Sequence, residues 1–247
     1  MRVAVISDMH GNDLAFEAVE ADINHQKIDQ IVCLGDAVQG GPQPAEVVHR
    51  LHRLNCPIVM GNADAWLISG EETGDEGIPP ERLKKMGDVR NWSLSQLTEA
   101  ERAFISDFQP TVTLHLEDDI DLLCFHGSPT SFDDVILPAA PEEEFQKFLG
   151  AYVGRILSGG HTHAQQIRRI GEYFFFNPGS VGFAYSHNQS DDDFHADPWA
   201  EYAVLTVENG QVSLEFRRVP FDSKEMIRIY RASGRPFADE AISQYQR

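Results

Sequence analysis

The sequence predicts an α/β protein in which two β-sheets pack face to face as a four-layer sandwich with helices outside. Apolar strand-like runs alternate with amphipathic helical runs at the start of the chain, and later strand-like runs are joined by short polar turns that are typical of hairpins. With 247 residues, 42% of them hydrophobic, the chain can bury a large core. We therefore expect one domain over residues 1–247, interrupted by a helical insertion or cap at about residues 64–107.

The first part of the chain predicts a parallel sheet. A β-branched run at residues 2–7 predicts a buried strand, and Asn12 is suited to cap the helix that follows. A second strand is expected at residues 30–34, a second helix at 44–54 and a third strand at 57–60. Because the connections are short, these strands should run parallel and be covered by the helices.

The segment at residues 64–107 departs from this alternation. It starts near Trp66, passes through an acidic stretch rich in glycine and proline at residues 70–80, and continues with polar helical patterns. We interpret it as a cap that shapes the entrance to the site described below, because it leaves the sheet beside one motif of that site. Trp66 fits two interpretations equally, a wall of that site or part of the core of the cap.

The second half of the chain predicts further strands in pairs. Hairpins are expected at residues 111–116 with 120–125, at 167–170 with 173–176, and at 202–207 with 212–219 around Asn209-Gly210. Between the first two pairs, the pattern indicates a helix at residues 141–152 and a strand at 155–158, and a last helix is expected at 223–232. These late hairpins indicate a second sheet.

Composition narrows the classes of function. The formal net charge of −19 argues against binding to a nucleic-acid polymer, which needs clustered lysine and arginine. A small phosphoester remains compatible, because bound divalent cations would reverse the field locally. No apolar run is long enough to predict a transmembrane helix, the N-terminus does not resemble a signal peptide, and the three cysteines are typical of buried thiols. We therefore expect a cytoplasmic protein without a membrane partner; its oligomeric state is not indicated.

Polar residues suited to bind metal ions follow five of the predicted strands. They are Asp8 and His10, Asp36, Asn62, His126, and the pair His161 and His163. In open α/β sheets the carboxyl ends of the strands line one edge, where ligands bind. We therefore expect these seven side chains to converge on one site.

The spacing and the donor types point to a pair of metal ions. In extended chain, residues i and i+2 point the same way, so Asp8 and His10 could hold one ion, and His161 and His163 could share an ion or serve two. Oxygen and imidazole donors without thiolate suit Mn, Fe, Zn, Co or Ni. The carboxylate of Asp36 could bridge two ions about 3.5–4 Å apart.

These residues resemble the motifs of the calcineurin-like metallophosphoesterase family. The family pattern is D-x-H, G-D, G-N, a lone His and G-H-x-H, and all five blocks occur here in that order: Asp8-Met9-His10, Gly35-Asp36, Gly61-Asn62, His126-Gly127 and Gly160-His161-Thr162-His163. The stretch Asn177-Pro178-Gly179-Ser180 is similar to the small bacterial and archaeal phosphodiesterase branch. The resemblance implies a two-sheet α/β sandwich.

The resemblance also implies the role of each residue. One ion would be held by Asp8, His10, Asp36 and His163, and the other by Asp36, Asn62, His126 and His161. Asp36 would bridge them, Asn62 would also face the phosphate, and a metal-bridging hydroxide would attack phosphorus. The expected catalytic residues are thus Asn62, Asp36 and His126. The expected cofactors are two divalent ions, with manganese as first choice and Fe, Zn, Ni or Co as alternatives. The expected substrate is a phosphodiester or nucleotide-like ester.

The sequence departs from the family pattern after Asn62. Many members have a histidine next, as a general acid or phosphate contact, whereas this chain has Ala63. Either the leaving group is a good one, or another group protonates it. His187 is a candidate for that group, and a solvated loop histidine is the other interpretation.

Two other functions fit the same motifs. Some relatives in the family are protein-binding scaffolds, but they have lost ligands that this sequence keeps. A protein phosphatase also fits, although the acidic surface and short chain disfavour it. The remaining histidines are expected to be structural or to face solvent: His25, His49, His52, His115 and His195.

Overall fold

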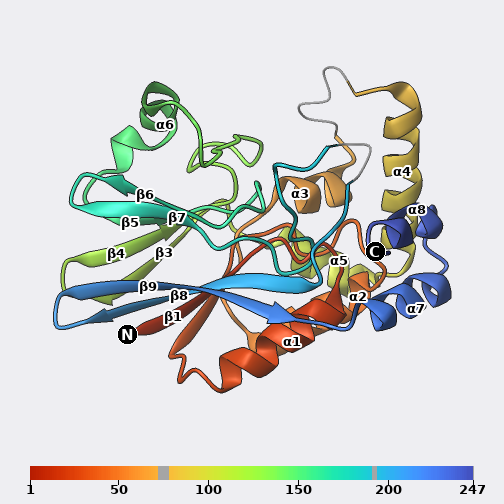
Figure 1. The fold of residues 1–247 in the computed structure, drawn as a ribbon, viewed down its shortest axis with the longest axis horizontal. Helices are drawn as coiled ribbons and strands as arrows, with labels where there is room; N and C mark the ends of the chain where they lie inside the picture. The colour runs from red at the N-terminus through yellow and green to blue at the C-terminus, as the bar shows by residue number, and fades with distance from the viewer. Residues whose placement is uncertain (72–77, 191–193, 247) are drawn as a thin grey trace.

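The protein is described by a computed structural model that covers residues 1–71, 78–190 and 194–246. Within these ranges two sheets pack against each other (Figure 1). The first sheet, ordered β2-β1-β8-β9, contains β1 (Arg2–Ile6), β2 (Gln30–Cys33), β8 (Trp199–Glu208) and β9 (Gln211–Pro220). The second, ordered β3-β4-β5-β7-β6, contains β3 (Val112–Glu117), β4 (Ile120–Cys124), β5 (Ile156–Ser158), β6 (Gln166–Ile170) and β7 (Tyr173–Asn177).

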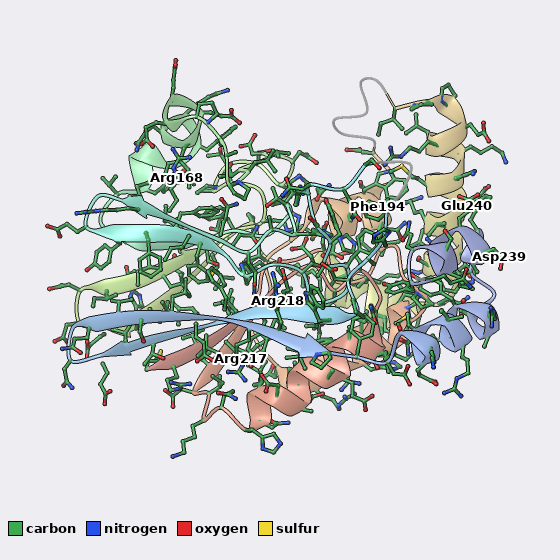
Figure 2. The ribbon with its side chains drawn as sticks, in the orientation of Figure 1. Arg168, Phe194, Arg217, Arg218, Asp239 and Glu240 are labelled. Atoms are coloured by element: carbon green, nitrogen blue, oxygen red, sulfur yellow. The ribbon has the colours of Figure 1, made fainter. Side chains whose placement is uncertain are left out.

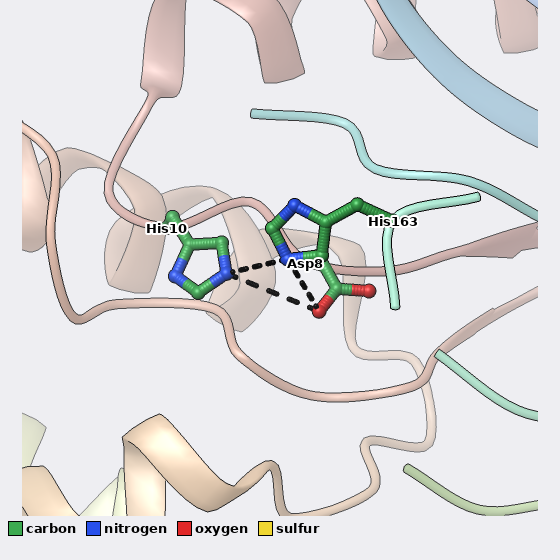
Figure 3. A group of neighbouring side chains, drawn as sticks. All are labelled: Asp8, His10 and His163. Atoms are coloured by element: carbon green, nitrogen blue, oxygen red, sulfur yellow. Dashed lines mark hydrogen bonds and ion pairs between the residues drawn. The ribbon is translucent and has the colours of Figure 1, made fainter. Parts of the chain in front are cut away.

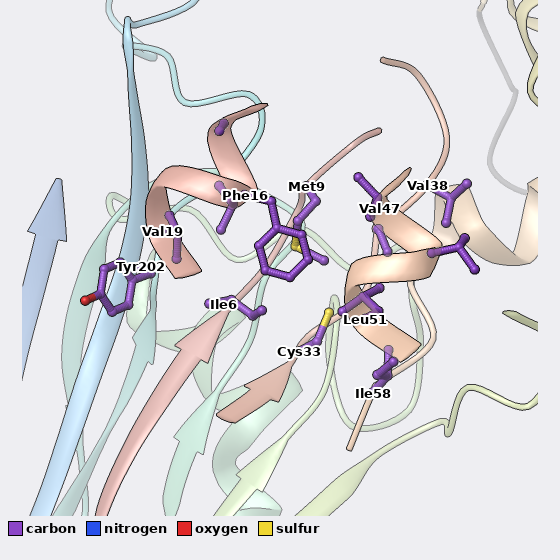
Figure 4. Close-up of a cluster of buried hydrophobic side chains, with 14 of the residues drawn as sticks. Ile6, Met9, Phe16, Val19, Cys33, Val38, Val47, Leu51, Ile58 and Tyr202 are labelled. Atoms are coloured by element: carbon purple, nitrogen blue, oxygen red, sulfur yellow. The ribbon is translucent and has the colours of Figure 1, made fainter. Parts of the chain in front are cut away.

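Alternating side chains of the strands fill two different layers of the core. On β1, Ala4 and Ile6 face the helices α1 (Asp13–Asn24) and α2 (Pro44–Leu54), as Figure 4 shows for Ile6 beside Phe16 and Leu51. The intervening residues Val3 and Val5 belong to the layer between the sheets. This period of two is what a strand buried on both faces requires.

The outer face of the second sheet is covered by α6 (Glu142–Leu149) and the short 3₁₀-helix Gly150–Tyr152 that follows it. Phe145 and Leu149 of α6 pack on Leu123 and Phe175 of the strands. The layers are therefore helix, sheet, sheet and helix, and the predicted four-layer α/β sandwich is confirmed.

The remaining helices gather beyond one end of the sheets (Figure 1). They are α3 (Asn62–Ser69), α4 (Pro80–Ser95), α5 (Glu99–Ser106), α7 (Ser223–Ser233) and α8 (Ala238–Ser243). The first three occupy the predicted insertion, of which residues 72–77 lie outside the described residues, and its status as a cap on a single domain stays a prediction. Lys85 of α4 forms an ion pair with Glu240 of α8 at 2.7 Å. None of the helices described has the length and apolar composition needed to cross a bilayer.

The predicted strand at residues 57–60 is wrong. Ile58 and Val59 form one isolated bridge each, to Cys33 of β2 and to Gln109 after α5. The segment is bracketed by Pro57 and Gly61 and is split between two neighbours, so no ladder develops. The first sheet is also mixed, because β8 pairs with β1 in the antiparallel sense. That pairing joins segments about 200 residues apart, which local patterns do not reveal.

Replacement of Leu51 by alanine should destabilise the fold, because this side chain is fully buried between α2 and the first sheet. The cavity left behind should lower the free energy of unfolding by about 2–5 kcal/mol. Urea unfolding followed by circular dichroism measures the change. Arg53→Ala on the exposed face of the same helix is the matched control and should shift it by less than about 0.5 kcal/mol. Equal effects of the two substitutions would contradict this description of the core.

Candidate metal centre

The seven predicted ligands all lie on connections at the ends of β1, β2, β4 and β5 and at the start of α3. Five of them have a positive backbone φ: Asp8 (56°), His10 (46°), Asp36 (50°), His161 (67°) and His163 (54°). Such a conformation costs a non-glycine residue on the order of 1–2 kcal/mol. The expectation that Asp8 and His10 align because the chain is extended is therefore wrong. Tight left-handed turns bring them together instead.

Asp8, His10 and His163 form the first group of possible metal ligands, with donor atoms within 4.8 Å of one another. Figure 3 shows their side chains pointing toward one another from separate loops. Asp8 Oδ1 lies 3.3 Å from His163 Nε2 and 3.9 Å from His10 Nε2. The two imidazole Nε2 atoms are 3.0 Å apart.

Asp36, His126 and His161 form the second group, with the same closeness. Asp36 Oδ2 lies 3.4 Å from His126 Nε2. Asn62 joins this group, because its Oδ1 lies 3.0 Å from both His126 Nε2 and His161 Nδ1. Asp36 Oδ2 is also 3.7 Å from His10 Nε2, so this carboxylate stands between the two groups.

The histidines present lone pairs to these groups. Three of them bond main-chain carbonyls through Nδ1: His10 to Gln39 (2.9 Å), His126 to Leu34 (2.8 Å) and His163 to Phe183 (2.7 Å). A carbonyl only accepts, so Nδ1 donates and Nε2 of the neutral ring is an acceptor. The Nε2 atoms of His10 and His163, 3.0 Å apart, are close enough to share a cation. A hydrogen bond from Nδ1 to a carbonyl, which orients the ring and leaves Nε2 free, is typical of histidines that bind metal.

The Asp8 carboxylate gives independent evidence that the residues of this cluster are suited to bind a cation. Its side chain is fully buried, and Oδ1 has no hydrogen-bond partner among the described residues. A buried carboxylate oxygen without a partner is costly unless a cation satisfies it. The donor set and this oxygen therefore fit divalent metal ions.

The charges in the cluster shift one another's pKa values. Burial raises the pKa of the Asp8 and Asp36 carboxyls, but the imidazoles of His163 and His126 outweigh it and hold both pKa values below the usual range. Burial disfavours the charged form of His126, yet the Asp36 carboxylate raises its pKa to about 10. For His10, burial prevails over Asp36 and the pKa is lowered. The carboxylates are thus ionised and attract positive charge.

Glycine is required where the backbone closes on the ligands. A Cβ at Gly61 would lie 2.1 Å from Asp36 Oδ1, and one at Gly160 would lie 2.2 Å from Ser7 Oγ and 2.9 Å from Asp8 Oδ2. Any side chain at either position would push the carboxylate aside. Glycine is needed at these two positions because the backbone lies too close to the neighbouring side chains to leave room for a Cβ atom.

The Asn-Pro-Gly-Ser stretch braces two ligand loops. Asn177 Nδ2 donates to Gly160 O at 2.6 Å, and Ser180 Oγ donates to Asp8 O at 2.8 Å. Both side chains are buried. The stretch therefore holds the loop that carries His161 against the loop that carries Asp8.

Asp64 has a role that the sequence did not reveal. Its buried carboxylate accepts hydrogen bonds from Ala37 N and Val38 N, both at 3.1 Å, and so positions the turn after Asp36. Burial, together with the Asp36 charge, raises the pKa of Asp64 to about 7. In the sequence, this role could be suspected only from the position of an acidic residue two places after Asn62.

His187 does not have the environment of a general acid. Its Nε2 donates to Thr162 O at 2.7 Å, and its ring lies 4.8 Å from that of Tyr185. It supports the turn between His161 and His163, and it is not among the residues that line the cavity at the cluster. The other histidines, His25, His49, His52, His115 and His195, belong to neither ligand group.

A cavity of about 590 Å³ opens on the ligand cluster. Its lining includes His10, Asp36 and Asn62 of the cluster together with side chains of α4 and α8. Trp66 also lines it, which favours its interpretation as a wall of the site.

Comparisons with known proteins identify similar structures and a related sequence. A metallophosphoesterase from Sphaerobacter thermophilus has a similar structure, with a TM-score of 0.73, 25% identity, and coverage of 99% of this chain and 98% of that one. A hypothetical protein from Pyrococcus horikoshii OT3 shares the fold, with a TM-score of 0.79 and 21% identity over 100% and 99% of the two chains. An uncharacterised protein of Methanocaldococcus jannaschii is 45% identical over 69 residues, which span 28% of this chain and 28% of that relative's own length.

The family model of the calcineurin-like phosphoesterase superfamily domain matches residues 1–210. This match covers all five motif blocks and every strand of both sheets except β9. The family predicted from the motifs is therefore confirmed, and the chain belongs to the calcineurin-like phosphoesterase superfamily.

Proposed function

We propose that the protein hydrolyses a small phosphate ester, most suitably a phosphodiester or nucleotide-like ester, at a centre that binds two divalent cations. The observation that carries the proposal is the convergence of two acceptor-rich groups on the shared carboxylate of Asp36. Bound ions would lower the pKa of an attacking water and neutralise charge on the phosphate. Manganese suits the oxygen and nitrogen donors, as would Fe, Zn, Ni or Co.

Different residues of the cluster would hold the two cations. Asp8, His10 and His163 would hold one cation, and His126, His161 and the Asn62 oxygen the other, with Asp36 between them. Because the Asn62 side chain turns Oδ1 toward the histidines, its amide nitrogen is left to donate to a phosphate oxygen in the cavity. Asn62 would thus orient the ester for in-line attack.

The surroundings of Ala63 favour an ester with a good leaving group. Ala63 lines the cavity where many family members carry a histidine, and His187 is engaged with Thr162 O. An aryl or nucleotide oxyanion leaves without prior protonation more readily than an alkoxide. This supports a phosphodiester in preference to an unactivated monoester.

A non-catalytic scaffold and a protein phosphatase have weaker support. All seven side chains of the family ligand set are present and converge, whereas a scaffold does not need them. The cavity is walled by α4 and α8, which suits a small ester better than a folded phosphoprotein.

Hydrolysis of bis(p-nitrophenyl) phosphate, an aryl phosphodiester, should depend on added Mn²⁺ and be abolished by a chelator. Asp36→Ala should lower kcat/KM by at least about 100-fold, because it removes the carboxylate shared by both groups. Release of nitrophenolate measures the rate. Asp118→Ala, at an exposed position in the β3–β4 turn, is the matched control. A metal-loaded protein without activity on any phosphoester would favour the scaffold.

The number of bound ions tests the two-group arrangement. His163→Ala and His126→Ala should each reduce the metal content from about two ions to about one per chain, because each removes a ligand of a different group. Elemental analysis after dialysis against Mn²⁺ gives the stoichiometry. His115→Ala, exposed on β3, should leave it at the wild-type value. A single ion in the wild type would rule out a dinuclear centre.

A further inference from the structure

Part of the cavity wall is built by segments of the chain that the motifs do not include. Val89 of α4, Arg235 of the α7–α8 connection and Phe237 at the start of α8 all line it. The family match ends at residue 210, so the C-terminal part of this wall lies outside it. The volume of about 590 Å³ lies in the range of roughly 300–1,000 Å³ that suits an organic ligand of nucleotide size.

Arg235 is held rigidly by main-chain carbonyls. Its Nε donates to Gly40 O at 2.6 Å, and its Nη1 donates to Pro236 O at 2.8 Å and to Phe237 O at 3.4 Å. These bonds fix the guanidinium plane at the cavity wall. No hydrogen-bond partner within the described residues is recorded for Nη2, so this nitrogen is available to a ligand.

The charge of Arg235 lacks an anionic partner in the described part of the chain. Glu240 acts on it electrostatically, but the carboxylate of Glu240 is paired with Lys85 at 2.7 Å. Figure 2 shows Glu240 on α8 near α4. Burial lowers the pKa of the Arg235 guanidinium, so its charge is poorly solvated. A partly buried, unpaired guanidinium at a cavity wall is suited to bind an anion.

The position of Arg235 separates it from the reacting phosphate. Arg235 is bonded to Gly40, and a Cβ at Gly40 would lie 3.8 Å from His10 Nδ1. The opposite nitrogen of that ring, Nε2, faces the ligand cluster. Arg235 therefore bonds to the loop that borders the Nδ1 side of the His10 imidazole, and it lines the same cavity as the cluster.

We propose that Arg235 binds a second anionic group of the substrate, and that the substrates are phosphoesters with at least two phosphates, as in nucleoside polyphosphates. The inference rests on the proposed function, which places the reacting phosphate at the ligand cluster. Trp66 and Phe237, which line the same cavity, supply aromatic surface for a nucleobase. The C-terminal segment thus selects the substrate, while the motif residues act on it.

Binding of two non-hydrolysable adenosine phosphonates to the Mn²⁺-loaded protein tests this role. One analogue carries a single anionic group and the other, α,β-methylene-ADP, carries two. Isothermal titration calorimetry should show about 10–100-fold tighter binding of the second, the effect of a charge-assisted hydrogen bond. Arg235→Met should remove most of this preference. Arg228→Met, an exposed arginine on α7, should keep it.

The substitution Arg235→Lys separates the effect of the positive charge from that of the hydrogen bonds to the main-chain carbonyls. It keeps the positive charge but loses the carbonyl bonds, so it should retain more of the preference than Arg235→Met. Equal loss in both variants would show that Arg235 only anchors the segment and would overturn the proposal. So would equal binding of the two analogues by the wild type, whether or not the variants fold.

The same preparation separates this proposal from the proposed function. Hydrolysis of bis(p-nitrophenyl) phosphate, which has one anionic group, tests catalysis by the metal centre. An inactive wild type that still prefers α,β-methylene-ADP would overturn the hydrolytic function and leave the role of Arg235 standing. An active wild type without the preference would overturn only the role of Arg235.

Discussion

The convergence of carboxylates and imidazoles at one buried point is the constraint on which the rest of the structure depends. Two carboxylates and several imidazole lone pairs converge there, and one oxygen of Asp8 has no hydrogen-bond partner among the described residues. Such an arrangement is stable only with positive charge at its centre. The fit to divalent cations follows from this local chemistry, independently of the family match.

The fold stabilises the strained backbone of this site through contacts with the surrounding residues. Five ligand residues have left-handed backbone conformations, which persist only when the surroundings determine them. The carbonyls that receive the histidine Nδ1 atoms, the carboxylate of Asp64 and the Asn-Pro-Gly-Ser stretch supply those surroundings. The two-sheet core carries the loops, and their hydrogen bonds orient the ligands.

The cavity joins the ligand cluster to parts of the chain that lie outside the five motifs. Helices α4 and α8, linked by Lys85 and Glu240, form a wall that the five motifs do not include. The motif residues and this wall therefore come from different segments of the chain.

The sequence by itself determined most strands and helices, the family and the seven residues that converge at the cluster, because period-two and helical patterns and short motifs are local properties. It did not determine that residues 57–60 form only bridges, that β8 pairs with β1, or that Asp8 and His10 meet through left-handed turns. Nor did it indicate the contact of Asp64 with Val38 or that of Arg235 with Gly40, which join residues 26 and 195 positions apart. Only the tertiary structure decided these features, since non-local contacts leave no periodic trace in the chain.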